Sequence, residues 1–329
     1  MYNEHFGFAE SPFNLTPDPR FFFANPCYEE AFATLRYGIG RRRGLIVVTG
    51  EAGTGKTTLL KKLLHGLEAN VQSVGIFDPH LSFAELLRCT LNELGITNAG
   101  EDRLTMMSQF HDYLVRQFES GQIVSLMIDE AQNLSQEMLE EIRLLSNLET
   151  DSEKLIQIVL AGQPDFEEKL GQAQLVQLKQ RVTLRCQLRP LEKYEVGSYI
   201  NSRLNTVCCK RQDLFDSESV ERIARYSKGI PRLVNIICDN AMLIAYASSA
   251  SRVSVKEIDE VARELKLLDE PRVAPRSTVG VLGNAGRAPL DFYHLGGDGT
   301  PKAAITGGAS PAEFDPLVFD VGPGPSGWA

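Results

Sequence analysis

The amino-acid sequence predicts an α/β fold in which helices sandwich a parallel sheet, followed by a small all-α lid domain. Two observations predict this order. Between residues 41 and 190, short apolar runs alternate with segments of helical periodicity, which is typical of βαβ units. After residue 191 the apolar runs stop, and only helical periodicity continues to residue 268. A chain of 329 residues has room for two domains of these sizes.

Four short apolar runs, each flanked by polar residues or glycine, are expected to be buried strands. They are residues 45–48, 71–77, 123–128 and 155–161. Helices are expected between and after them, over residues 56–67, 82–94, 103–119 and 136–148. The all-α part is expected to contain helices over residues 193–209, 217–228, 231–249 and 255–268. The Ser82-to-Glu85 and Ser254-to-Glu257 spacings each predict a capping box.

Both ends of the chain differ in composition from this body. The first 40 residues mix phenylalanines with prolines, which predicts an irregular strap and then a helix near residues 28–39. We expect the strap to pack its aromatic rings against the α/β domain. The last 60 residues hold 11 glycines and 8 prolines, which predicts a disordered, flexible tail that tethers the chain or binds a partner. The expected divisions are therefore residues 1–40, 41–190, 191–268 and 269–329.

Charge and cysteine usage exclude several classes of protein. The chain has 34 Lys and Arg against 43 Asp and Glu, a formal charge of −9, which disfavours a dedicated non-specific nucleic-acid binder. The first residues lack the basic and apolar regions of a secretory signal, and no apolar run approaches the ~18 residues that cross a bilayer. The cysteines form no CxxC pair, and the histidines show no metal-binding spacing. These features predict a cytoplasmic protein with no direct membrane span.

The clearest motif follows the first expected strand. Residues 50–57 read Gly-Glu-Ala-Gly-Thr-Gly-Lys-Thr and match the phosphate-binding pattern G-x-x-x-x-G-K-[ST]. In such a P-loop, backbone N–H groups surround the phosphates at a helix N-terminus. Lys56 is expected to reach the β- and γ-phosphates of ATP, and the Thr57 hydroxyl to ligate Mg²⁺. The expected nucleotide contacts are Gly50, Glu51, Ala52, Gly53, Thr54, Gly55, Lys56, Thr57 and Thr58.

A second motif follows the third expected strand. Residues 123–128 run directly into Asp129 and Glu130. Ligands bind at the carboxyl edge of a parallel sheet, so Asp129 is expected beside the P-loop, where it would hold Mg²⁺ through water. Glu130 is then expected to polarise the attacking water as a general base. The two motifs together predict an ATPase.

Further short segments extend this set of motifs. They are Phe6-Gly7-Phe8, Ser11-Pro12-Phe13, Thr16-Pro17-Asp18-Pro19, Asp129-Glu130-Ala131-Gln132, Leu160-Ala161-Gly162-Gln163-Pro164, Gln180-Arg181-Val182 and Gly229-Ile230-Pro231-Arg232. With the P-loop, this set resembles the AAA+ ATPases and, among them, the ExeA-like (general secretion pathway A-type) group, which is related to the TniB/TnsC transposition ATPases. The resemblance covers residues 1–268.

The resemblance implies three further site residues. Gln163 is similar to sensor 1, which reads the γ-phosphate or orients water, although a turn residue before a proline is the alternative. Arg181 is similar to an arginine finger that reaches the nucleotide of a neighbouring subunit, with a solvated helix end as the alternative. Arg232 is similar to sensor 2, although a proline-started helix is also locally sensible there. A finger acting between subunits implies a homo-oligomer, either a ring or a filament. By the same analogy, Tyr37 or Ile39 would border the adenine.

The resemblance also implies a process. It predicts an ATPase that drives or regulates assembly of a bacterial cell-envelope apparatus: a secretion system, a pilus or an exopolysaccharide exporter. Such a protein would lie peripherally at the inner membrane through a membrane-associated partner. One alternative is a DNA-associated transposition regulator, which the formal charge of −7 on residues 1–269 disfavours. The other is a slowly hydrolysing nucleotide switch, which the presence of Glu130 and Arg181 disfavours.

Overall fold

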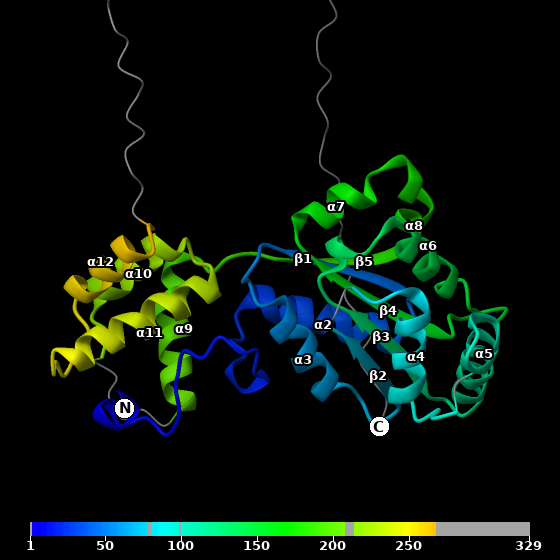
Figure 1. Ribbon diagram of the computed structural model, residues 1–329, viewed down its shortest axis with the longest axis horizontal. Helices are drawn as coiled ribbons and strands as arrows, with labels where there is room; N and C mark the ends of the chain where they lie inside the picture. The colour runs from blue at the N-terminus through cyan, green and yellow to red at the C-terminus, as the bar shows by residue number, and fades with distance from the viewer. Residues whose placement is uncertain (1, 78–79, 99, 208–213, 268–329) are drawn as a thin grey trace, which may run out of the picture. The chain divides into compact units, whose positions relative to one another are not determined.

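A five-stranded parallel sheet organises the first part of the computed structural model, which describes residues 2–77, 80–98, 100–207 and 214–267 (Figure 1). In spatial order its strands are β2 (Val71–Ile76), β3 (Ile123–Ile128), β4 (Ile156–Gly162), β1 (Leu45–Gly50) and β5 (Val182–Leu188). All neighbouring pairs are parallel, so every carboxyl end lies at the same edge of the sheet. The three inner strands are buried along their whole length, which is why they read as apolar runs.

Helices cover both faces of this sheet, as the alternation of side chains along the strands requires. Ile46 and Val48 of β1 belong to one apolar cluster, and Leu45 and Val47 belong to the other. On the first face lie α2 (Pro26–Gly40) and α3 (Lys56–Gly66). On the second lie α4 (Phe83–Glu93), α5 (Arg103–Glu119), α6 (Gln136–Leu145), α7 (Pro164–Leu170) and α8 (Val176–Arg181).

The four expected strands are all present, but the sequence analysis missed β5, α7 and α8. β5 lies at the edge of the sheet beside β1, and Thr183, Arg185 and Gln187 are exposed on it. An edge strand with alternating exposure carries no continuous apolar run, so the pattern used for the inner strands does not detect it. α7 and α8 are only 7 and 6 residues long, too short for a clear helical period.

Four helices form the all-α part of the described chain. They are α9 (Lys193–Thr206), α10 (Ser217–Ser227), α11 (Pro231–Ala247) and α12 (Val255–Glu264). α10 packs against α9, α11 and α12, and α11 also packs against α12. Both expected capping boxes are present, Ser82 with Glu85 and Ser254 with Glu257. The expected tail at residues 269–329 lies outside the described residues.

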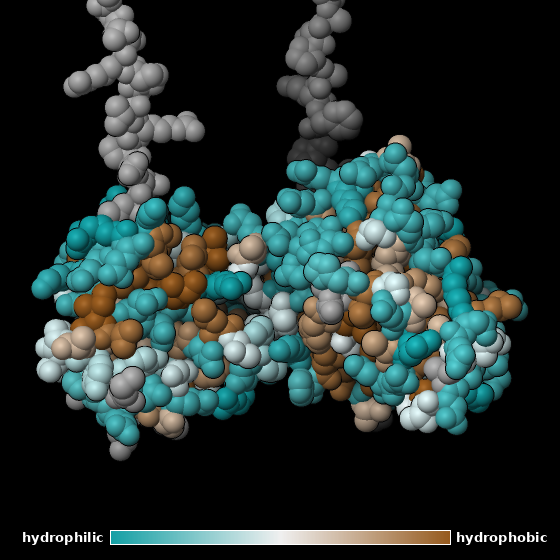
Figure 2. Space-filling model, in the orientation of Figure 1, coloured by the Kyte–Doolittle hydropathy of each residue, from teal (hydrophilic) through white to brown (hydrophobic). Residues whose placement is uncertain are grey.

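The N-terminal strap corrects one expectation. Its first helix, α1 (Tyr2–Phe6), contacts α11, and the ring of Phe13 meets that of Phe215 edge-on in the all-α part. The rings therefore pack to a large extent on the helical part and not only on the α/β domain. The physical reason is that α11 is apolar on most of its circumference and offers a second surface to bury. Figure 2 shows apolar side chains gathered over this helical part, around α11.

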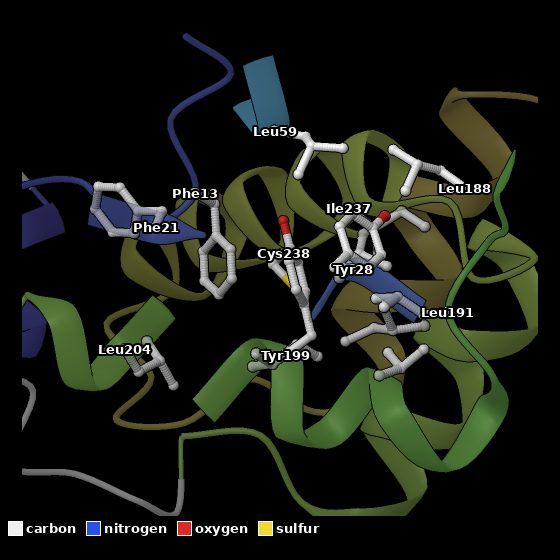
Figure 3. Close-up of a cluster of buried hydrophobic side chains, with 14 of the residues drawn as sticks. Phe13, Phe21, Tyr28, Leu59, Leu188, Leu191, Tyr199, Leu204, Ile237 and Cys238 are labelled. Atoms are coloured by element: carbon white, nitrogen blue, oxygen red, sulfur yellow. The ribbon is translucent and has the colours of Figure 1, made fainter. Parts of the chain in front are cut away.

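The strap also joins the two parts into one core. η1 (Pro19–Phe21) contacts both α3 and α9. Figure 3 shows Phe13 and Phe21 of the strap in one buried cluster with Leu59 of α3, Tyr199 of α9 and Ile237 of α11. No helix in the described part of the chain is both long and apolar enough to cross a membrane.

Gly229 lies just before α11, and its backbone is hydrogen-bonded to the segment that leads into α9. Its carbonyl accepts a hydrogen bond from the Leu191 backbone N–H at 2.8 Å, and its φ is +74°. A Cβ atom at this position would lie 1.9 Å from the Leu191 carbonyl oxygen. Only glycine fits here, both for its backbone conformation and for the space available.

We therefore expect Gly229→Ala to lower the free energy of unfolding by about 3 kcal/mol or more, because backbone must move away from backbone. Urea unfolding of the purified variant measures this. Gly121→Ala is the matched control: Gly121 has a similar φ of +75°, but a Cβ there meets nothing within 4 Å. The control is expected to lose only about 1 kcal/mol. Equal losses in the two variants would contradict the steric argument.

Candidate functional site

The P-loop connects the end of β1 to the start of α3, in the position the motif requires. Gly53 has a φ of +81°, and a Cβ there would lie 2.7 Å from the Cβ of Arg232. The Gly53 carbonyl accepts a hydrogen bond from the Arg232 backbone N–H at 3.2 Å. The loop is therefore held on one side by α3 and on the other by the first turn of α11.

Lys56 lies folded over this loop. Its side chain is buried, and Nζ donates to the carbonyl oxygens of Gly50 at 2.7 Å and Glu51 at 3.1 Å. Burial lowers the pKa of Lys56, while the nearby charges of Glu130 and Asp129 raise it. The ammonium group is thus fixed at the mouth of the P-loop, where phosphate oxygens would replace its carbonyl partners.

Asp129 follows β3 directly and lies against the P-loop helix. Its carboxylate accepts a hydrogen bond from the Thr57 hydroxyl, and its other oxygen accepts one from the Glu130 backbone N–H at 2.9 Å. Only 3% of Asp129 is exposed. Burial raises the pKa of this carboxyl, and the two hydrogen bonds partly oppose that effect. The structure therefore brings together the two oxygen donors, Thr57 and Asp129, that the sequence analysis assigned to Mg²⁺.

Glu130 is held by two glutamines. Its backbone has a φ of +51°, at the entrance to the short turn η2 (Ala131–Asn133). The Gln132 side-chain amide donates to Oε2 of Glu130, and Gln163 Nε2 lies 3.4 Å from the same oxygen. Gln132 also accepts a hydrogen bond from the Gln163 backbone N–H, at 3.0 Å. Gln163 ends β4, so the ends of two neighbouring strands meet here. The sequence analysis quoted Gln132 in a motif and gave it no role.

A cavity of about 350 Å³ contains most of these groups. It is lined by the P-loop from Gly53 to Thr58, by Glu130 and Arg232, by strap residues 14–18 and 21–23, and by side chains of α2, α9 and α11. That size suits a nucleotide-sized ligand. The P-loop forms one end of the cavity, and the remaining walls come mainly from the strap and the all-α part.

Three nearly buried polar residues in these walls, Tyr199, Arg203 and Asn235, belong to no sequence motif. The sequence analysis therefore did not identify them. Arg203 donates to the carbonyl oxygens of Pro12 at 2.7 Å and Asn14 at 3.0 Å, so it ties the strap to α9. It also donates to the Tyr199 hydroxyl at 3.1 Å, which in turn donates to Oδ1 of Asn235 at 3.0 Å. The three come from separate turns of α9 and α11, and only tertiary packing brings them to one wall.

The residues expected to border adenine are placed elsewhere. Ile39 is fully buried in the apolar cluster on the first face of the sheet, and Tyr37 is 50% exposed and lines a different cavity with Arg36 and Arg41. Neither lines the cavity at the P-loop. Tyr28, from the start of the same helix, does line it, and its hydroxyl donates to the Thr54 carbonyl of the P-loop.

Arg232 and Arg181 lie in different places. The Arg232 side chain is exposed and lines the cavity beside the P-loop. Arg181 ends α8 directly before β5, and the register of β5 on β1 places Val182 beside Leu45, at the sheet edge opposite to the P-loop. Arg181 is therefore remote from the nucleotide cavity of its own chain.

The nearby arginines differ from Arg181 in their partners. Arg185 pairs with Glu167 at 2.5 Å, and Arg189 pairs with Glu195 at 3.1 Å. Within the part of the chain that the structure describes, no hydrogen bond or ion pair engages the Arg181 side chain. Of these three arginines, Arg181 is the one whose guanidinium is not already held by a carboxylate of its own chain.

This fold and this site define a P-loop protein of the AAA+ class. A sequence model of the family described as AAA domain matches residues 39–170. The fold is similar to that of the Cdc6p protein from Pyrobaculum aerophilum, with a TM-score of 0.62 and 18% identity over 77% of this chain and 70% of that one. It is also similar to the Aeropyrum pernix ORC1 protein solved in complex with DNA, with a TM-score of 0.60 and 17% identity over 78% and 70%.

Within this class the chain is similar to the ExeA-like AAA+ proteins. It is 36% identical over 266 residues to the General secretion pathway protein A of Aeromonas hydrophila. The matched region covers 80% of this chain and 48% of the relative, so the chain spans about half of that protein's length.

The burial of Asp129 predicts that its ionised carboxylate lowers the free energy of unfolding. Because burial raises its pKa, the folded carboxyl gives up its proton at a higher pH than the unfolded one, and the ionised form costs stability at neutral pH. We expect nucleotide-free Asp129→Asn to be more stable than wild type at pH 7, with a difference that shrinks toward about pH 4. Urea midpoints at the two pH values measure this.

The control is Asp151→Asn, because Asp151 is exposed and should show no such change. An Asp129→Asn protein that is less stable than wild type at pH 7, or a difference that does not vary with pH, would contradict the prediction.

Proposed function

We propose that this protein binds ATP with Mg²⁺ and hydrolyses it. The observation that carries the proposal is the meeting of the P-loop, Glu130 and Arg232 around one cavity, with Asp129 in contact with Thr57 behind it. A P-loop alone supports nucleotide binding. A carboxylate that reaches the same cavity supports the hydrolysis step as well.

The donor set beside the P-loop fits Mg²⁺. A threonine hydroxyl and a carboxylate are hard oxygen ligands, and Mg²⁺ is commonly held by one or two such groups with water and phosphate oxygens completing its shell. When bound, the cation neutralises charge on the β- and γ-phosphates. Thr57 would ligate it directly and Asp129 through water, in place of the hydrogen bond that now joins the two.

Each side chain then has one task in hydrolysis. Lys56 leaves the carbonyls of Gly50 and Glu51 and donates to phosphate oxygens. Glu130 accepts a proton from the attacking water, and the Gln163 amide orients that water or reads the γ-phosphate. Arg232, at the first turn of α11, binds phosphate from the side of the all-α part.

We further propose that this activity drives or regulates assembly of a cell-envelope apparatus. The identity with a general secretion pathway protein supports this process, and a membrane-associated protein is the partner it implies. We propose a homo-oligomer in which Arg181 of one subunit completes the site of the next. Two observations support that assignment. Arg181 lies at the sheet edge remote from its own P-loop, and within the described residues its side chain makes no hydrogen bond or ion pair.

The test of hydrolysis compares three proteins. Wild type should release phosphate from ATP in the presence of Mg²⁺. Lys56→Ala should lose this activity about 100-fold or more, because the phosphate charge is no longer neutralised. Glu130→Gln should bind ATP as wild type does and hydrolyse it about 100-fold or more slowly, because it cannot accept the proton. Phosphate release by Glu130→Gln at the wild-type rate would remove Glu130 from the mechanism.

The shared site is tested by mixing subunits. An Arg181→Ala protein should hydrolyse ATP about 1,000-fold more slowly or worse, and when added to wild type it should reduce the activity of wild type. Phosphate release should also rise more steeply than linearly with protein concentration. Arg185→Ala is the matched control, since Glu167 already engages that arginine, and it should leave the mixture unaffected. Activity that is linear in concentration and insensitive to mixing would exclude a site shared between subunits.

A further inference from the structure

The Gln132 side chain lies between two groups to which the proposed mechanism assigns a role. It joins the carboxylate of Glu130, which follows β3, to the backbone of Gln163, which ends β4. We propose that Gln132 is a positioning residue for hydrolysis: it holds one oxygen of Glu130 so that the other faces the attacking water. This inference rests on the proposed ATPase function and names a residue that the function did not include.

The chemistry of its partners sets the orientation of the Gln132 amide. A backbone N–H can only donate, so the group that it meets 3.0 Å away must be the amide oxygen of Gln132. The amide nitrogen therefore points the other way, toward Oε2 of Glu130. An ionised carboxylate can only accept, so this contact is satisfied as well. The two hydrogen-bond partners of the Gln132 amide therefore require the same orientation.

The two oxygens of Glu130 consequently have different surroundings. Oε2 receives the Gln132 amide and lies 3.4 Å from the Gln163 amide nitrogen. Among the residues that the structure describes, no group donates a hydrogen bond to Oε1. Glu130 lines the nucleotide cavity. One oxygen is thus anchored to the protein, and the other remains available to take a proton from water.

The turn that carries Gln132 does not depend on its side chain. The backbone N–H groups of Asn133 and Leu134 donate to the carbonyls of Glu130 at 2.9 Å and Ala131 at 3.2 Å. Lys169 Nζ also donates to the carbonyls of Gln132, at 3.0 Å, and Leu134. Removal of the amide should therefore leave the turn folded and release only the carboxylate, which separates a positioning role from a structural one.

The Gln132 amide is anchored on the Gln163 backbone. Its contacts therefore link the end of β4 to Glu130, which follows β3. A shift of Gln163 on binding the γ-phosphate would move the oxygen acceptor of the bridge and, with it, the direction of the Glu130 carboxylate. The cost of losing such an orienting group is commonly about 10–100-fold in rate.

The experiment measures steady-state ATP hydrolysis with Mg²⁺ by the full chain. Gln132→Ala should lower kcat about 10–100-fold with KM for ATP and the thermal midpoint unchanged. Gln136→Ala is the matched control: it is an exposed glutamine four positions further on, at the start of α6, and should match wild type. The decisive protein is the double variant, in which Gln132→Ala is added to Glu130→Gln.

If Gln132 acts through Glu130, the double variant hydrolyses ATP no more slowly than Glu130→Gln alone, since the group to be positioned is already gone. A further fall in the double variant, a rise in KM with kcat unchanged, or wild-type kcat in Gln132→Ala would each overturn the inference while leaving the ATPase function intact. A wild-type protein that hydrolyses no ATP would instead overturn the proposed function, and this inference with it.

Discussion

The parallel pairing of β3, β4 and β1 is the constraint on which the rest of the site depends. Because the three strands run side by side in one direction, the residues that follow them lie at one edge of the sheet. The P-loop follows β1, Asp129 and Glu130 follow β3, and Gln163 ends β4. Each sits at the end of a buried strand that packing holds rigidly on both faces, which suits groups that must meet within hydrogen-bonding distance.

The strap and the all-α part form the other half of the cavity, and hydrogen bonds between distant segments hold them in place. The P-loop meets α11 through the Gly53 carbonyl, and the strap meets α9 through two carbonyls bound by Arg203. These contacts join segments 179 to 191 positions apart in the sequence. The Arg203 side chain that binds the strap is buried, where an unmet hydrogen bond is costly. The strap therefore serves as a wall of the cavity and as the link between the two parts of the chain.

Where the sequence analysis failed, the failures have a common cause. β5 is an edge strand, so its pattern alternates and resembles a loop with polar residues. The rings of the strap were assigned to the α/β domain because nothing in the pattern of α11 shows that its second apolar side is open to them. Tyr28 and Gln132 are ordinary residues by type and spacing. In each case the missing information was which surface a segment faces, and local periodicity does not contain it.

The sequence by itself determined the inner strands, their helices, the P-loop and the Asp129-Glu130 pair, because a buried parallel strand and a phosphate-binding turn each leave a local pattern. Tertiary structure alone decided the order of the strands, the far wall of the cavity and the partners of each arginine. It also decided that Gln132 faces Glu130. These depend on contacts between segments distant in the chain, and the free energy of such contacts is set by the packing of the whole domain and not by any one stretch of residues.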